Sequence, residues 1–190
     1  MTCRSLSGIT KDNCLSNKGG LKTTVWATNR SNLVINKEKD NNKEETGYAT
    51  LTWKEGKGPS DMVSYSFRKQ SSGLTSEGTF DDANGVSFFT NNLALVFARQ
   101  NVEKRLAIQA LALQEDLAVI VEDANGEIHF LGMDDSVTTT AAGANTGTAA
   151  SDANNYTITL TDISNELPYL VKSATLEALL EAGSGSGNGE

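Results

Sequence analysis

The sequence contains few cysteines, prolines and aromatic residues, and it has no long hydrophobic run. Two of the 190 residues are cysteine, two are proline, and aromatic residues make up 6%. Cys3 and Cys14 are too few for a disulfide framework or for a zinc site made of cysteines alone. We expect them to be reduced and structural; the alternative is a bridge across the N-terminal loop in an oxidising setting. No apolar run approaches the length of a membrane span, and no signal-peptide core follows Met1, so we expect neither membrane insertion nor secretion.

Catalytic and nucleotide-binding motifs are also missing. The sequence has no G-x-S-x-G elbow, no phosphate-binding loop and no G-x-G-x-x-G that opens a helix. His129, the single histidine, alternates with Ile128 and Phe130 as on a strand face, although a triad assembled from distant segments stays possible. Acids in the EDANGE segment lack the spacing of an EF-hand and are interpreted as solvated residues around a turn. The sequence therefore predicts no enzyme, no catalytic or metal-binding residues and no cofactor.

Charge is unevenly distributed along the chain. The net charge is −8, yet residues 1–110 hold 15 of the 16 Lys and Arg against 11 acids, whereas residues 111–190 hold Lys172 against 13 acids. One interpretation is an acidic, soluble surface. The other is that oppositely charged faces of neighbouring subunits meet head to tail, as in rings or filaments. A sequence-specific DNA-binding protein is disfavoured, because such proteins neutralise phosphates with basic residues.

The segment 101–132 carries the clearest structural signals. Apolar residues at helical spacing predict an amphipathic helix over 102–114, with Asn101 as its N-cap and Glu103 in its first turn. LAVIVED and EIHFLG follow as two β-rich runs, joined by the turn Asp123-Ala124-Asn125-Gly126. The sequence thus predicts a helix that leads into a tight antiparallel hairpin.

Most of the remaining chain reads as strands and polar loops. The strands expected from alternation and β-propensity are 21–29, 32–36, 47–54, 61–70, 86–99, 136–141, 156–162 and 168–171. Asn91-Asn92 predicts a turn or bulge, and a longer helix over 92–103 is the alternative. Segments expected to be loops are 37–46, 55–61 and 142–155, and residues 175–182 are expected to be helical.

These elements predict a mainly β protein of the α+β type: an antiparallel β-sandwich or barrel with one helix packed on it, at about residues 101–114. We expect an N-terminal loop or arm over 1–20 and a single sandwich domain over 21–173. A short helix and a flexible, glycine-rich tail are expected over 174–190.

Several segments together resemble a known family. The helix followed by LAVIVEDANGEIHFLG, and then the strand YTITLTD, resembles the C-terminal half of tail tube-type virion proteins. Such proteins are encoded by tailed phages and prophages of Bacteroidetes. The opening, CRSLSGITKDNC followed by GGLKTTVWAT, is similar to the start of the same group, whereas the segment 37–46 has no counterpart in it. The resemblance covers most of the chain, but through hydrophobic patterns and one turn rather than a catalytic signature.

The resemblance implies a structural subunit of a virion, assembled in the bacterial cytoplasm. It implies homo-oligomeric rings, typically of six subunits, that stack into a tube, contact other virion proteins and let DNA pass without specific binding. Acids lining the lumen would repel DNA phosphates; the candidates are Glu122, Asp123, Asp134 and Asp135. Arms that reach the next ring would come from two loops, with the candidates Lys37, Glu38, Lys39, Asp40, Lys43, Glu44, Glu45, Lys54 and Lys57.

Other functions fit the same fold. A head-tail connector or neck protein and a capsid decoration protein are the nearest alternatives. A soluble ligand-binding β-sandwich is the alternative from a different class, and it would need a concave aromatic site. Trp26 and Trp53 are weak evidence for one, because each is expected to pack on a strand. Size in solution distinguishes these classes, since a binding module forms a small closed species whereas a tube protein forms rings or polymers.

Overall fold

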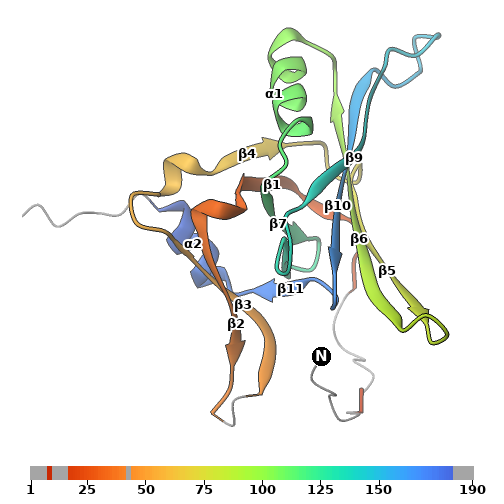
Figure 1. Ribbon diagram of the computed structural model, residues 1–190. Coiled ribbons are helices and arrows are strands. Elements are labelled where there is room, and N and C mark those ends of the chain that lie inside the picture. The colour runs from red at the N-terminus through yellow and green to blue at the C-terminus, as the bar shows by residue number, and fades with distance from the viewer. Residues whose placement is uncertain (1–7, 10–16, 42–43, 182–190) are drawn as a thin grey trace, which may run out of the picture.

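The computed structural model describes residues 8–9, 17–41 and 44–181, and these form a β-sandwich flanked by two α-helices (Figure 1). Cys3 and Cys14, and the tail after Glu181, lie outside the described residues. The elements in chain order are β1 (Leu21–Asn29), β2 (Leu33–Lys39), β3 (Glu45–Trp53), β4 (Val63–Ser66), β5 (Gly73–Asp81), β6 (Val86–Ala98), α1 (Val102–Ala112), β7 (Leu117–Asp123), β8 (Ile128–Leu131), β9 (Thr138–Asn145), β10 (Asn155–Ser164), β11 (Tyr169–Val171) and α2 (Ser173–Leu180).

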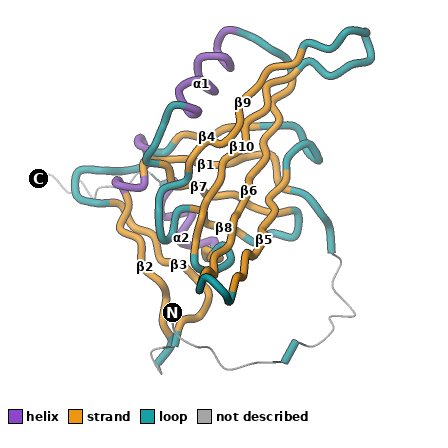
Figure 2. Tube along the Cα trace, turned by 45° about the vertical axis from the view of Figure 1, so that its right-hand side comes forward, coloured by secondary structure: helices purple, strands orange, loops and turns teal. Residues whose placement is uncertain are grey.

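Two sheets form the sandwich. The larger sheet has seven strands in the order β2-β3-β11-β8-β7-β1-β4, and the smaller has four in the order β5-β6-β10-β9. Neighbouring strands are antiparallel except for the parallel pair β11–β3. Figure 2 shows the four strands of the smaller sheet side by side. The predicted class, a mainly β sandwich with a packed helix, is therefore confirmed.

The main hydrophobic core lies between the two sheets. The hairpin strand β7 contributes side chains to this core, because its residues are buried on both faces of the larger sheet. Val119 and Val121 face the smaller sheet, where they join Leu93 and Leu160 in one cluster, and all four are at most 1% exposed. Period-two alternation thus places every second residue of β7 in this core.

A second core lies on the opposite face of the larger sheet, beneath α2. Ile120 and Phe130 from the sheet pack here with Leu176 and Leu179 from the helix. Trp53, which packs at the edge of this cluster, donates from its indole Nε1 to the carbonyl of Leu179 at 3.1 Å. The C-terminal helix is therefore an integral third layer rather than an appendage. No helix among the described residues is long and apolar enough to cross a membrane.

Helix α1 covers one end of the sandwich and begins where the sequence predicts. The side chain of Asn101 accepts a hydrogen bond from the Lys104 amide at 2.8 Å, which confirms it as the N-cap. The expected burial of the apolar positions is only partly correct. Ile108 and Leu111 enter the main core, whereas other apolar side chains of the helix and the turn after it, Leu106 and Leu113, are 59% and 74% exposed.

Replacing Asn101 with alanine should destabilise the fold by about 1 kcal/mol, because the first turn of α1 would lose its side-chain acceptor. Urea unfolding followed by circular dichroism measures this change. Asn101→Asp is the control, since aspartate keeps an acceptor at the cap and should leave the unfolding midpoint close to that of the unchanged protein. Equal midpoints for the alanine variant and the unchanged protein would contradict the capping role.

Strand β6 corrects two predictions made for one segment. It pairs with β10 without interruption from Phe89–Ser164 to Ala98–Asn155, so Asn91-Asn92 is neither a turn nor a bulge. The alternative prediction, a helix over 92–103, is also wrong for residues 92–98, because these belong to β6. The physical reason is a partner far away in sequence: Asn91 lies opposite Asp162, and its side chain donates to that carboxylate at 3.0 Å.

Other strand boundaries differ from the predicted ones, mainly where the strands are exposed. β5 was not predicted, because residues 75–80 are all exposed and its sequence has no apolar alternation. The expected loop 37–46 is largely the end of a long hairpin, since β2 continues to Lys39 and β3 begins at Glu45. β9 extends to Asn145 into a segment expected to be a loop, whereas β4 is shorter than expected.

Candidate assembly surfaces

The smaller sheet has two edges that no described strand covers. β5 forms one edge and β9 the other. β9 has the sequence TTTAAGAN, with no charged residue and no proline, and seven of its eight residues are exposed. Proteins usually protect an exposed edge of this length with charges, prolines or a covering segment, because unpaired backbone groups recruit other strands. β9 lacks these protections, so it is a candidate site for strand pairing with another chain.

The outer face of the smaller sheet is rich in hydroxyl groups. Its four strands contain no Lys, Arg or His. Thr161 donates to the side chain of Asn92 at 2.7 Å and contacts the Thr140 hydroxyl at 2.8 Å, which links three strands across the face. By register Glu77 lies opposite Thr90 on the same face. Asp81 lies opposite Val86 on the same face, and the apolar Ile163 lies opposite Thr90. The face therefore presents neutral polar groups, two acids and some exposed apolar side chains.

Apolar side chains are exposed where β5 turns into β6. The ring of Phe80 is 66% exposed and contacts Phe89 edge to face, with ring centroids 5.6 Å apart. Val86 and Leu167 are 39% and 55% exposed. Apolar surface of this kind, next to an unpaired edge strand, is suited to contact with another protein.

A mixed charged and aromatic cluster anchors the β2–β3 hairpin to β11. We call the hairpin residues of this cluster, Lys37, Glu38 and Glu45, the hairpin base. The Tyr169 hydroxyl donates within hydrogen-bond distance of two carboxylates, at 2.9 Å from Glu45 and 2.5 Å from Glu166. Lys37 lies 3.9 Å and 3.5 Å from the same carboxylates and above the Tyr169 ring. Burial, and then the two carboxylates, raise the pKa of Tyr169 well above its usual value. This cluster fixes the hairpin to the C-terminal strand.

The predicted arm residues separate into three environments. Lys37, Glu38 and Glu45 belong to the hairpin base, where Glu38 also pairs with Lys172 at 2.6 Å. Lys39, Asp40 and Glu44 lie at the hairpin end, and the Asp40 side chain accepts from the Glu44 amide at 2.9 Å. Lys54 and Lys57 follow β3 at its opposite end, where Lys57 pairs with Asp61 at 3.5 Å. Lys43 lies outside the described residues.

Two predicted lumen acids belong to the β7–β8 turn of the larger sheet. Glu122 pairs with Lys22. Asp123 accepts from the amides of Asn125 and Glu127 at 2.8 and 2.9 Å. Its burial alone would raise the pKa of Asp123, but the turn amides outweigh this effect and lower the pKa. The turn is thus confirmed as a hairpin loop, and Asp123 stabilises it.

The other two predicted lumen acids lie in the segment between β8 and β9. Asp134 accepts from the backbone amide and side chain of Asn165 at 2.9 and 3.2 Å, and Asp135 accepts from the next amide. Arg30 donates to the carbonyls of residues 132–134 at 2.8 to 3.3 Å and fixes this segment. None of the four predicted acids is on a strand of the smaller sheet.

His129 lies beside Asp123 in a hollow of about 510 Å³ between the two sheets' edges. Its Nε2 is 3.9 Å from the Asp123 carboxylate. Ser76 also lines this hollow, but among the described residues no hydrogen bond joins it to His129. A triad requires the nucleophile and the imidazole to be hydrogen-bonded. Asp123, the carboxylate beside His129, accepts instead from the amides of its own turn.

Sequence reasoning missed a buried polar cluster at one end of the main core. Asn91 and Asp162 are 0% and 1% exposed, and the Asn91 amide donates to both Asp162 and Ser164 at 3.0 Å. One oxygen of each, Asn91 Oδ1 and Asp162 Oδ1, has no hydrogen-bond partner among the described residues. Burial raises the pKa of Asp162 above its usual value. The sequence did hold a signal for this cluster: Asp162 occupies a position on the buried face of an alternating strand, YTITLTDIS.

Comparison with known proteins yields no relative: the chain matches no family model, and neither the curated proteins nor the solved structures give a match. The fold and the surfaces described above therefore carry the functional argument.

Proposed function

We propose that the chain is a virion structural protein, a tail tube subunit that assembles into rings which stack into a DNA-conducting channel. The observation that carries this proposal is the four-stranded sheet with two uncovered edges, one of them the uncharged strand β9, and an outer face without basic residues. The resemblance of the segment 101–162 to tail tube-type proteins supplies the class of function. The partners are further copies of the chain and other virion proteins.

The strand directions of the smaller sheet favour assembly side by side. Neighbouring strands in the order β5-β6-β10-β9 alternate in direction, so β5 and β9 run oppositely. When two copies are related by rotation about an axis along the strands, β9 of one copy meets β5 of the next in antiparallel orientation. Each contact is heterologous and leaves one edge free at each end, and repetition closes a ring when the rotation between neighbouring copies divides a full turn. The result is a continuous antiparallel barrel.

The outer face of the smaller sheet suits the inside of such a barrel. DNA slides without adhering when the wall offers no Lys or Arg to its phosphates. The four strands carry none, and Glu77 contributes a negative charge on this face. In this arrangement Glu77 and Asp81 replace Glu122 and Asp123 as the acids that face the channel, because Glu122 and Asp123 lie on the larger sheet.

Sedimentation velocity over a concentration series tests the proposal. A tube subunit should sediment as rings and larger polymers whose size increases with concentration. A ligand-binding β-sandwich would sediment as a small closed species at every concentration, and that outcome would overturn the proposed function.

The end of the β2–β3 hairpin is expected to contact the next ring. Replacing residues 40–44 with Asn-Gly shortens the hairpin to a two-residue turn between the paired residues Lys39 and Glu45. We expect a folded subunit that still forms rings, with tubes shorter than those of the unchanged protein. Negative-stain micrographs give the distribution of tube lengths.

A longer deletion serves as the comparison. Removing residues 37–46 also removes Lys37 and Glu45, which contact Tyr169 at the hairpin base, so this variant should unfold at lower urea concentration. Tubes of unchanged length in the short-deletion variant would exclude the hairpin end from the contact between rings.

A further inference from the structure

The two ends of the smaller sheet carry opposite charge. At one end Ala98 of β6 pairs with Asn155, and at the other the β5–β6 hairpin closes with Asp81 opposite Val86. We name the first the basic end; its cations are Arg68, Lys69, Arg99, Lys104 and Arg105, against the acids Glu103 and Asp152. We name the second the acidic end; its acids are Asp81, Asp82, Asp134, Asp135 and Glu166.

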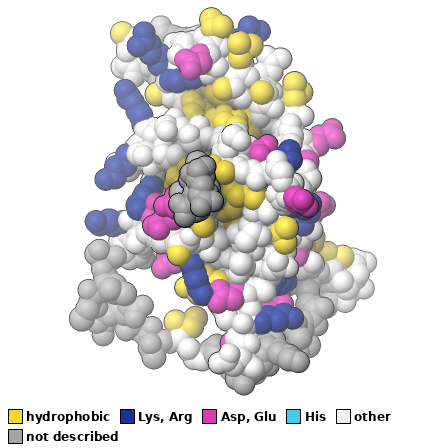
Figure 3. Space-filling view, turned by 90° about the vertical axis from the view of Figure 1, so that its left-hand side faces the viewer, with side chains coloured by type: hydrophobic (Ala, Val, Ile, Leu, Met, Phe, Trp, Pro, Cys, Tyr) yellow, Lys and Arg dark blue, Asp and Glu magenta, His cyan; other side chains and the backbone are white. Residues whose placement is uncertain are grey.

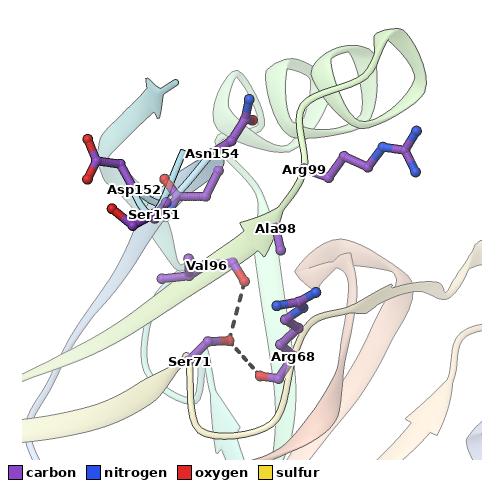
Figure 4. A pocket seen from close by; sticks show the side chains of 10 residues that line it. Arg68, Ser71, Val96, Ala98, Arg99, Ser151, Asp152 and Asn154 are labelled. Atoms are coloured by element: carbon purple, nitrogen blue, oxygen red, sulfur yellow. Dashed lines mark hydrogen bonds between the residues drawn. The ribbon is translucent and has the colours of Figure 1, made fainter. Parts of the chain in front are cut away.

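The basic end contains an open hollow of about 560 Å³ beside two arginines. Figure 4 shows Arg68 and Arg99 on one side of this hollow and Asp152 on the other. Among the described residues, neither arginine side chain pairs with an acid. Both are exposed, so their guanidinium groups are available to an external carboxylate.

Local hydrogen bonds hold this arrangement in place. Lys104 donates to the carbonyls of Ala98 and Arg99 at 2.6 and 3.3 Å, next to the left-handed backbone of Arg99 at φ 64°. The Asp152 carboxylate accepts from two amides and a hydroxyl of residues 148–149 at 2.8 to 3.0 Å. Asp152 is therefore hydrogen-bonded within its own turn through Oδ2, and among the described residues it forms no ion pair with either arginine. In Figure 3, Lys and Arg side chains run along the left edge of the face from the top, the end that carries α1, to mid-height, and others lie in the lower part.

The acidic end presents carboxylate oxygens that can accept hydrogen bonds from the arginines of another copy. Asp82 is exposed and has no hydrogen-bond or ion-pair partner among the described residues. Asp134 and Asp135 each use one carboxylate oxygen in local hydrogen bonds. No Lys or Arg occurs in residues 81–91, 132–136 or 162–168. Cations from elsewhere reach this end: Arg30 donates to the carbonyls of residues 132–134, and Lys37 is shared between Glu45 and Glu166.

We propose that the basic end of one copy docks on the acidic end of a second copy in the next ring. Each copy carries both the basic end and the acidic end, at opposite ends of one sheet. Every copy can therefore contact one neighbour through its basic end and another through its acidic end. Such a head-to-tail contact repeats without limit and gives the stack a direction. Opposite charge fixes the partner and the orientation. This inference rests on the proposed function and specifies the surfaces through which its rings stack.

Charge reversal at each end tests the contact. Arg68→Glu with Arg99→Glu makes the basic end acidic, and Asp82→Lys with Asp135→Lys makes the acidic end basic. Each double variant should form rings, but tubes should require about tenfold higher protein concentration or more, because like charges then meet. The quadruple variant, and an equimolar mixture of the two double variants, should restore tubes at low salt. Sedimentation velocity and negative-stain microscopy measure both steps.

Glu127→Lys with Glu177→Lys is the matched control for the acidic end, since it changes the net charge by the same amount at two exposed acids that lie outside the smaller sheet, in the β7–β8 turn and in α2. It should leave tube formation unchanged. Tubes that form normally in both double variants would overturn this inference and leave the proposed function intact. Loss of rings as well as tubes would place the contacts within the ring and also overturn it. Absence of rings in the unchanged protein would overturn the proposed function and the inference together.

Discussion

A single proline in β9 is expected to weaken ring formation while the subunit stays folded. Successive amides of an edge strand point alternately toward its partner and away from it. Of the two variants Ala141→Pro and Ala142→Pro, one therefore loses an amide that points away from β10. That variant keeps the β9–β10 ladder, but it places a proline ring where the strand of another copy would pair. The protein concentration at which rings form should rise by about tenfold or more.

The other proline variant removes a hydrogen bond between β9 and β10, so it should lower the stability of the subunit as well. Comparing the two variants by thermal unfolding and by sedimentation velocity separates folding from assembly. Ala150→Pro, in the exposed connection between β9 and β10, is the control and should assemble normally. Normal ring formation by both β9 variants would contradict pairing through this edge.

Replacing Asp162 with asparagine should stabilise the subunit near neutral pH by about 1–3 kcal/mol. In the native protein Asp162 is buried, and one of its oxygens and one of Asn91 have no partner among the described residues. The asparagine amide can donate to Asn91 Oδ1, while its oxygen accepts the hydrogen bond that Asp162 accepts now. The variant also avoids burying a negative charge, which is expensive in a hydrophobic core.

The effect should depend on pH in a defined direction. Burial raises the pKa of Asp162, so the folded state holds this proton more tightly than the unfolded state does. The free energy of unfolding of the unchanged protein should therefore fall as pH rises from the usual aspartate range through the raised pKa. Asp162→Asn lacks this dependence, and its advantage should grow from acidic to neutral pH.

Urea unfolding at several pH values measures this difference. Asp82→Asn serves as the control, because Asp82 is exposed and should change the unfolding free energy by less than about 0.5 kcal/mol. A destabilised Asp162→Asn variant at neutral pH would show that the carboxylate makes a favourable interaction in the folded protein.

The sequence predicts those elements whose signals are local. α1 and the β7–β8 hairpin follow from an N-cap, an apolar pattern and a turn with glycine at positive φ. β5 could not be predicted in this way, because an exposed edge strand needs no apolar face. The continuity of β6 through Asn91 depends on Asp162, which is distant in sequence and supplies the polar partner that makes a buried asparagine tolerable.

The candidate surfaces were predicted less well than the fold. Charge asymmetry along the chain was compatible with an acidic surface or with a head-to-tail contact, and only the folded chain brings Arg68 and Arg99 to one end of a sheet. The arm residues were assigned to two expected loops, yet Lys37 and Glu45 contact each other and Tyr169 at the hairpin base. The parallel pairing of β11 with β3, which creates that base, has no local signal.

Negative-stain electron microscopy of the purified protein over a concentration series tests the central claim most directly. We predict hollow rings at low concentration and tubes as the concentration increases, with the four-stranded sheets lining the channel. Separate monomers at every concentration would contradict self-assembly and with it the proposed role as a tube subunit.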